Sequence, residues 1–191
     1  MTIQLLAISG SARRESYNRK LLAAMVEGAR AAGAQVEVLD WAAYPLPIMD
    51  EDLEAAGIPE AARRLKAALR AADGYLIATP ENNSGYPALL KNALDWGSRG
   101  LGDPPGSGMV YKNKTAVVAG ATPGRWGALR SIRQLREVLG YLGCIVLPDT
   151  LSVIDASKAF DADGQLIDAK TRAMAQAVGA ALVRATLALK S

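Results

Sequence analysis

The chain has 191 residues, of which half are hydrophobic and about a fifth are charged, so it lacks the polar composition of a disordered protein. This length predicts a single domain over residues 1–191 with a sizeable buried core. Lys and Arg exceed Asp and Glu by 22 to 19, and no basic block interleaved with aromatic residues occurs, so we expect no nucleic-acid partner.

Apolar runs and helix-period segments alternate along the first third of the chain. Residues 3–8 form a continuous apolar run, which predicts a strand covered on both faces. Apolar residues then recur at helical spacing over residues 21–29, and Gly33 marks the end of that helix. A second strand is predicted over residues 36–40, and a loop with three prolines follows over residues 41–59.

The same alternation continues to the end of the chain. Helices are predicted over residues 60–72, 88–96, 128–142 and 168–189, and strands over residues 75–78, 115–119 and 145–147, with a surface loop over residues 99–108. Five strands alternating with helices predict an α/β fold with a parallel sheet. With right-handed crossovers, the expected architecture is a flavodoxin-like three-layer sandwich with the five strands in the order 2-1-3-4-5.

Three loops of this fold are expected to meet at one edge of the sheet. They span residues 9–18, 79–87 and 120–127, and each follows a predicted strand. The carboxyl ends of parallel strands share an edge, and ligands of such sheets bind there, between strands 1 and 3. The three loops therefore predict the functional site.

The first loop, SGSARRESYN, is dense in hydrogen-bond donors. Ser11, Ser16 and Asn18 offer neutral donors and Arg13 a charged one, next to the N-terminus of a helix, where an anion is favoured. The loop has neither a Walker lysine nor the glycine spacing of a dinucleotide fingerprint. Two interpretations stay open: the loop binds a phosphate, or Ser16 or Asn18 caps the helix while the arginines are solvated.

The sequence contains no histidine and one cysteine, Cys144, within an apolar run. The absence of histidine excludes Ser-His-Asp and Cys-His catalysis and most zinc chemistry, which points to a bound cofactor. A lone cysteine of this kind predicts a buried structural thiol and a reducing, cytoplasmic setting. No signal-peptide pattern and no membrane-length apolar run occurs, so we expect a soluble protein.

Two motifs in these loops carry a resemblance to a known family. The first motif, G-S-x-R-x-x-S-x-N, is matched at Gly10, Ser11, Arg13, Ser16 and Asn18. The second motif is T-P-E-Y-N followed by L-K-N-A-x-D-W, and it is matched at Thr79, Pro80, Glu81, Asn83, Leu90, Lys91, Asn92, Ala93, Asp95 and Trp96. The chain resembles, over nearly its whole length, the NAD(P)H-dependent FMN reductases, which include bacterial quinone and chromate reductases.

The resemblance implies a cofactor, a reaction and a set of contacts. It implies that FMN accepts hydride from NADH or NADPH at flavin N5 and passes two electrons to a quinone, free flavin or similar acceptor. It also implies a homodimer or homotetramer. The implied contacts are Ser11, Arg13, Ser16, Tyr17 and Asn18 in the phosphate loop, Pro80, Glu81, Asn82 and Asn83 along the ring, and Thr122 and Gly124 near its edge.

The chain departs from the family pattern at two positions, where Asn82 replaces an aromatic residue and Gly85 replaces a serine. Both changes concern the choice of acceptor, and the choice between NADH and NADPH is also left open. A flavodoxin-type electron carrier, or a flavin-free protein that kept the fold, is an alternative to an enzyme.

Several conspicuous residues have structural explanations instead. Leu94 and Trp96 are expected in the core of their helix, and Glu81 is expected to anchor its loop by accepting backbone hydrogen bonds. Trp126, next to Arg125, fits either a substrate pocket or a subunit contact. The acidic residues 50–52 and the segment 160–164 are expected to form surface turns.

Overall fold

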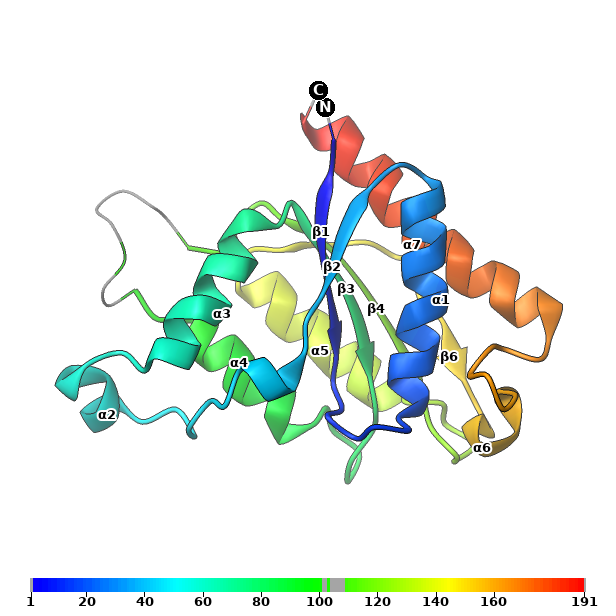
Figure 1. Ribbon diagram of the computed structural model, residues 1–191, viewed down its shortest axis with the longest axis horizontal. Helices are drawn as coiled ribbons and strands as arrows, with labels where there is room; N and C mark the ends of the chain where they lie inside the picture. The colour runs from blue at the N-terminus through cyan, green and yellow to red at the C-terminus, as the bar shows by residue number, and fades with distance from the viewer. Residues whose placement is uncertain (1, 101–102, 104–108, 191) are drawn as a thin grey trace.

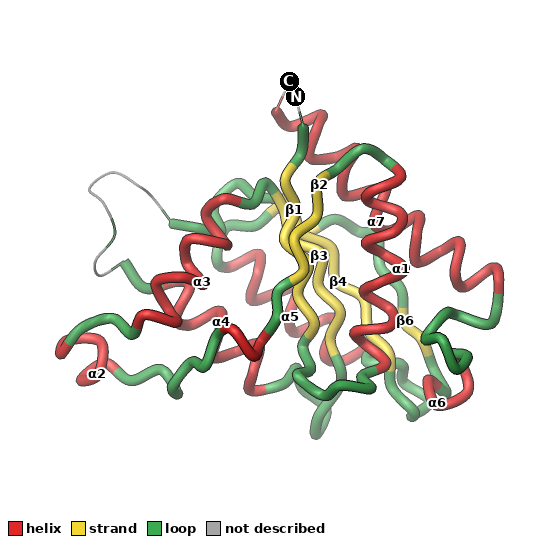
Figure 2. Tube along the Cα trace, in the orientation of Figure 1, coloured by secondary structure: helices red, strands yellow, loops and turns green. Residues whose placement is uncertain are grey.

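A parallel β-sheet with helices on both faces forms the centre of the molecule (Figures 1 and 2). The computed structural model describes residues 2–100, 103 and 109–190. The strands follow the order β2-β1-β3-β4-β5, with β6 also paired to β4. Their bounds are β1 Gln4–Ser9, β2 Gln35–Val38, β3 Gly74–Thr79, β4 Thr115–Ala121, β5 Ile145–Val146 and β6 Ser152–Val153. The predicted fold class and strand order are confirmed.

The apolar runs of the three central strands, β1, β3 and β4, lack a two-residue period because both faces of these strands are covered. Every residue of β3 and β4 is buried, as is all of β1 except its first residue, Gln4. A strand covered by helices on both faces needs apolar side chains at every position. By contrast, β2 lies at the edge of the sheet and is mostly exposed.

The helices divide between the two faces of the sheet (Figure 1). One face carries α1 (Tyr17–Ala31) and α7 (Ala169–Lys190), and the other carries α3 (Glu60–Ala71), α4 (Ala88–Ser98) and α5 (Leu129–Tyr141). Leu94 and Trp96 of α4 are buried, as predicted.

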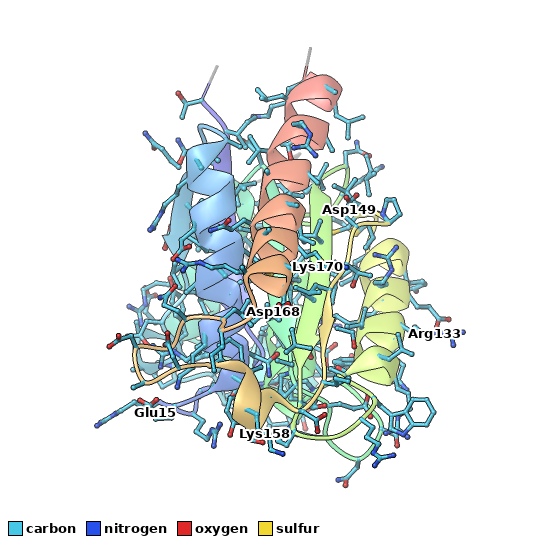
Figure 3. All side chains as sticks on the ribbon, turned by 90° about the vertical axis from the view of Figure 1, so that its right-hand side faces the viewer. Glu15, Arg133, Asp149, Lys158, Asp168 and Lys170 are labelled. Atoms are coloured by element: carbon cyan, nitrogen blue, oxygen red, sulfur yellow. The ribbon has the colours of Figure 1, made fainter. Side chains whose placement is uncertain are left out.

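Helices α1 and α7 touch backbone to backbone. A Cβ on Gly28 would lie 2.0 Å from the carbonyl oxygen of Gln176, and one on Gly179 would lie 1.9 Å from that of Met25. No side chain fits at such distances, so glycine at these two positions permits the close contact. The two helices run side by side in both views (Figures 1 and 3).

The segment predicted as a loop over residues 41–59 contains two short helices, η1 (Trp41–Ala43) and α2 (Glu51–Ala56). The carboxylate of Asp40 accepts a hydrogen bond from the N–H of Ala42 and caps η1, so the second strand ends at Val38 and not at residue 40. The carboxylate of Asp50 accepts from two N–H groups of α2. The acidic residues 50–52 therefore begin a helix, and the prediction of a turn there was wrong.

The fifth strand is shorter than predicted and is followed by two elements that the sequence did not reveal. Pro148, which has no N–H, interrupts pairing after β5, and the Thr150 hydroxyl donates to the Val118 carbonyl at 2.6 Å in the gap. The chain then rejoins β4 as β6 and continues into α6 (Ala156–Ala159). A two-residue strand has no period that a sequence can reveal.

Cys144 is buried, as predicted, and its thiol lies 3.4 Å from the Tyr111 carbonyl oxygen. Burial raises the pKa of the Cys144 thiol to about 12, although Lys114 opposes the shift. The segment 160–164 is a turn closed by a hydrogen bond from the N–H of Gly164 to the carbonyl of Asp161. Most of the loop predicted over residues 99–108 lies outside the described residues.

Candidate functional site

A cleft of about 540 Å³ lies where the loops after β1, β3 and β4 meet, at the lower edge of the sheet in Figure 1. The predicted site residues that line it are Ser11, Arg13, Ser16, Tyr17, Asn18, Pro80, Glu81, Asn82 and Thr122. Asn83 and Gly124 do not line it, and both are exposed. The topology thus brings the three loops together as expected, while contact of any of these residues with a cofactor stays a prediction.

Gly10 brings the first loop against the second. Its N–H donates to the Ala78 carbonyl at 2.7 Å. A Cβ at this position would lie 2.8 Å from side-chain atoms of both Leu90 and Pro80. The glycine of the first motif is therefore required by close packing behind the cleft, and the loop backbone is held at the cleft wall.

Ser16 caps α1, because its hydroxyl oxygen accepts a hydrogen bond from the N–H of Asn18 at 3.2 Å. The capping interpretation of Ser16 is thus confirmed, and the hydroxyl proton of Ser16 remains available for a second bond. Asn18 has a role that the sequence did not reveal. Its carboxamide donates to the carbonyl of Ala121 and accepts from the N–H of the same residue, both at 2.9 Å. This buried pair joins the first loop to the third.

Arg13 and Tyr17 form one layer of the cleft wall. The Arg13 guanidinium lies 5.1 Å from the centre of the Tyr17 ring and donates to the Glu15 carbonyl at 2.6 Å. The Tyr17 ring also stacks on the Phe160 ring, with the ring centroids 6.1 Å apart and the ring planes at 12°. Phe160 follows α6, whose Lys158 lies at the same edge of the molecule as Glu15 (Figure 3).

The second loop is a tight hairpin. Asn82 and Gly85 exchange two backbone hydrogen bonds, of 2.9 and 3.0 Å, and the residues between them, Asn83 and Ser84, have φ of 49° and 66°. Two consecutive positive φ values define a type I′ turn, in which asparagine is favoured. Asn83, and not Asn82, therefore provides the tolerance for unusual backbone angles. The N–H groups of Asn82 and Gly85 are used within the turn.

Glu81 anchors the second loop to α5, as predicted. Its carboxylate accepts from the N–H groups of Arg130 and Ser131 at 3.0 and 3.4 Å, and forms an ion pair with the Arg130 guanidinium. Burial alone raises the pKa of Glu81, but hydrogen bonds from Arg130 and Ser131 outweigh burial, so this pKa lies below its ordinary value of 4.5. Glu81 is thus an anion at neutral pH.

The third loop is fixed through its backbone. The N–H of Thr122 donates to Val153 of β6, and the carbonyl of Thr122 accepts from Ala156 of α6. Beside it, the Trp126 side chain is 62% exposed, and the Arg130 guanidinium lies 5.6 Å from the centre of its rings. The alternatives for Trp126, a substrate pocket or a subunit contact, both remain open.

The donors of the first loop fit a phosphate group. Within the described ranges, the backbone N–H groups of Ala12 and Tyr17 donate to no other residue, and both residues line the cleft. These groups lie beside the N-terminus of α1, the Ser16 hydroxyl and the Arg13 guanidinium, which all favour an anion. The opposite wall, with Pro80, Pro87 and Leu89, offers apolar surface to a flat ring.

In the described part of the chain, no group of three or more His, Cys, Asp or Glu residues is placed to hold a metal ion. Among the helices whose residues are described, none combines the length and the apolar character needed to cross a membrane.

Comparison with known proteins shows which family the chain matches and which enzymes it is similar to. Residues 3–159 match the family model for NADPH-dependent FMN reductases. The chain is 39% identical to an NAD(P)H-dependent FMN reductase of Pseudomonas aeruginosa over 91% of this chain and 90% of that one. It is 38% identical to a quinone reductase of Pseudomonas putida over 89% and 87% of the two chains. The flavoenzyme NAD(P)H:(acceptor) oxidoreductase FerB of Paracoccus denitrificans superposes with a TM-score of 0.81, at 31% identity and 98% coverage of both chains.

Proposed function

Because the chain belongs to the NADPH-dependent FMN reductase family, we propose that it is an FMN-dependent oxidoreductase that uses NADPH or NADH to reduce a quinone, free flavin or a similar small acceptor. The observation that supports this proposal most directly is the cleft between β1 and β3, where free N–H groups and Arg13 meet an apolar wall. Such a cleft suits a molecule with a phosphate at one end and a flat ring at the other.

In this proposal the first loop binds the FMN phosphate. The N–H groups of Ala12 and Tyr17 and the hydroxyls of Ser11 and Ser16 donate to the phosphate oxygens, and the dipole of α1 favours their charge. The Arg13 guanidinium lies over Tyr17, within the same wall, and adds a charged donor. Asn18 acts differently, since its pair with Ala121 fixes the position of the loop.

Residues of the second loop would hold the ring. Pro80 and Leu89 supply an apolar wall, and Asn82, which lines the cleft and is exposed, would meet an acceptor that enters from solvent. FMN, when bound, supplies two-electron chemistry between NAD(P)H and the acceptor. Glu81 is not a proton donor at neutral pH, because Arg130 holds its carboxylate as an anion.

Turnover of purified protein tests this function against its alternatives. We expect the protein to bind FMN and to oxidise NADPH or NADH steadily when menadione is supplied, at a rate proportional to the fraction of protein carrying FMN. A protein that binds FMN but consumes no NAD(P)H with any quinone would be an electron carrier. A protein that binds no FMN at micromolar concentration would be a scaffold, and the proposal would be wrong.

We also propose that the protein forms a homodimer or homotetramer and acts in the cytoplasm. Trp126, Leu129 and Ile154 expose apolar surface beside the third loop, as expected of a subunit contact close to the cleft. The lone buried thiol of Cys144 is compatible with a reducing compartment. Sedimentation at several concentrations tests the first point, with a charged substitution at Leu129 expected to weaken association.

A further inference from the structure

A second hollow, of about 880 Å³, lies behind the first loop. It is bounded by α1, by the end of β2 with η1, and by Ser9, Ser11 and Ala12 of the loop. Ser11 and Ala12 also line the cleft described above, so the loop itself separates the two spaces. The volume falls within the range of about 300–1,000 Å³ that is usual for small-molecule sites.

The contact between α1 and α7 accounts for this space. Gly28 and Gly179 allow the backbones of the two helices to touch, which draws α1 toward α7. The opposite stripe of α1 faces the edge strand β2, and the sheet has no further strand beyond β2. Figure 1 shows α1 beside α7, with β2 passing on the other side of α1. The hollow therefore lies on the side of α1 that faces away from α7.

The wall formed by α1 is long and apolar in the middle. The residues at helical spacing that line it run from Arg19 through Leu22 and Val26 to Arg30, a stretch of about 16 Å along the helix axis. Across the hollow lie Trp41 of η1 and Val38 of β2, the latter 53% exposed. Leu22, Val26 and Trp41 are themselves buried and form the floor of the hollow, so the apolar surface open to a ligand comes mainly from Ala23 and Val38. An elongated apolar body would cover that surface.

The charge at the loop end of the hollow is positive. No residue in the part of the chain that the structure describes forms a hydrogen bond or ion pair with the side chains of Arg14 and Arg19. At the other end, Arg30 donates to the Val36 carbonyl at 3.0 Å. The two carboxylates in the lining are engaged, Glu27 with Arg172 and Gln176, and Asp40 with the N–H of Ala42. The lining thus carries three guanidinium groups against two carboxylates, of which Glu27 is paired with Arg172, so its net charge is positive.

We infer that this hollow binds an elongated organic anion, with an aromatic or acyl body along α1 and a carboxylate, sulfonate or phosphate group held by Arg14 and Arg19. The apolar walls favour the body through burial, and the guanidinium groups favour the head through charge-assisted hydrogen bonds. The site lies on the other side of the first loop from the proposed flavin cleft, and it is formed by that loop, α1, the end of β2 and η1.

Titration calorimetry with two related probes tests this inference on protein saturated with FMN. The anionic probe is 8-anilinonaphthalene-1-sulfonate, and the neutral one is N-phenyl-1-naphthylamine, which has the same ring body without the sulfonate. We expect one sulfonate probe per chain, bound without release of FMN. Arg19→Ala should weaken the anionic probe about ten-fold and the neutral probe less than two-fold.

A substitution that fills the hollow provides a second test. Ala23 is exposed on α1 and lines the hollow, so Ala23→Trp should weaken both probes at least ten-fold. Ala31→Trp, on an exposed position of the same helix outside the hollow, is the matched control and should change neither.

Probe binding that releases FMN, or that Ala23→Trp leaves unaltered, would overturn the inference. Equal loss of both probes in Arg19→Ala would exclude anion recognition. A change of sedimentation in Ala23→Trp without a change in probe affinity would assign the hollow to a second copy of the chain.

Discussion

The side-chain amide of Asn18 and the backbone of Ala121 form a closed pair of hydrogen bonds between loops that are 103 residues apart in the sequence. Asn18 lies in the first turn of α1 and is only 2% exposed, while Ala121 ends β4. The pair fixes the distance between the first and third loops, and with it the width of the cleft. A single side chain thus couples the proposed phosphate site to the end of β4.

Replacing Asn18 by alanine should therefore affect both stability and cofactor binding. The change leaves the N–H and carbonyl of Ala121 buried without their partner, which should lower the free energy of unfolding by about 1–3 kcal/mol. We expect FMN affinity to fall at least ten-fold, because the loop loses its fixed position. Urea unfolding of the FMN-free protein and FMN titration measure the two effects.

Asn92 provides the matched control for this variant. Its carboxamide makes the same kind of pair, donating to the Pro47 carbonyl and accepting from the N–H of Met49, both at 2.8 Å, but it does not line the cleft. Asn92→Ala should lower stability by a smaller amount, because the Trp96 indole N–H still donates to the Pro47 carbonyl, and should leave FMN affinity within about two-fold. Similar FMN losses in both variants would mean that stability alone, and not the position of the first loop, controls binding.

Arg13→Ala should weaken FMN selectively. The guanidinium is the charged group of the first loop that lines the cleft, and loss of a charge-assisted contact costs about 1.5–3 kcal/mol, or ten-fold or more in affinity. Riboflavin, which has no phosphate, should bind the variant and the original protein almost equally. Arg14→Ala is the control, because Arg14 lines the second hollow and not the cleft. Equal losses for FMN and riboflavin would contradict a phosphate contact.

Asn82→Tyr should alter the acceptor more than the cofactor. The backbone of Asn82 is paired with Gly85, so the turn does not depend on this side chain, which is exposed at the open end of the cleft. An aromatic ring there adds a contact of about 0.5–1.5 kcal/mol, which should change FMN affinity less than ten-fold. The KM for a quinone should change more. A hundred-fold change in FMN affinity with unaltered quinone kinetics would assign Asn82 to the cofactor.

Glu81→Gln should reduce stability in a manner that depends on pH. The carboxylate binds Arg130 and two N–H groups of α5, and its pKa is lowered in the folded protein. A lowered pKa stabilises the folded state fully above the unfolded value of 4.5, and this contribution is lost as the pH falls through the folded value. The variant should therefore be less stable by about 1–2 kcal/mol at neutral pH, with a smaller difference in acid.

Urea unfolding from neutral to acidic pH checks this expectation. Glu60→Gln is the control, since Glu60 is an exposed carboxylate at the start of α3. Its substitution should produce little change at any pH. A difference between the Glu81 variant and the original protein that stays constant into acid would show that the carboxylate charge contributes nothing.

The Cys144 thiol should react slowly in the folded protein. It is buried, and its pKa of about 12 leaves almost no thiolate at neutral or mildly alkaline pH. We expect a thiol reagent such as dithionitrobenzoate to label the native protein at least a hundred-fold more slowly than the protein unfolded in urea. As this is the only cysteine of the chain, the labelling rate reports on a single position. Rapid labelling of native protein would contradict its burial.

The parts of the fold that could be predicted from the sequence are those specified by local patterns. The runs of β1, β3 and β4 are apolar at nearly every position because both faces are covered, with polar residues only at their ends, and the strand order brings the three loops together. The contacts within the cleft depend on partners distant in the chain. Neither the pairing of Asn18 with Ala121 nor the stacking of Tyr17 on Phe160 has a local signal. The turn at Asn83 and Ser84 does have a local signal, because asparagine tolerates positive φ better than most residues.

The glycine contact between α1 and α7 can form only after α7 has been synthesised, so the fold is completed late. Leu21 and Met25 of α1 are buried together with Leu182 of α7, in one cluster on one face of the sheet. During synthesis, β1 to β6 leave the ribosome before α7 does, so the part of that face that α1 does not cover stays in contact with water until residues 169–190 arrive. An apolar sheet surface that is open in this way favours aggregation of a nascent chain. The last helix thus closes the surface through which unfinished chains would associate.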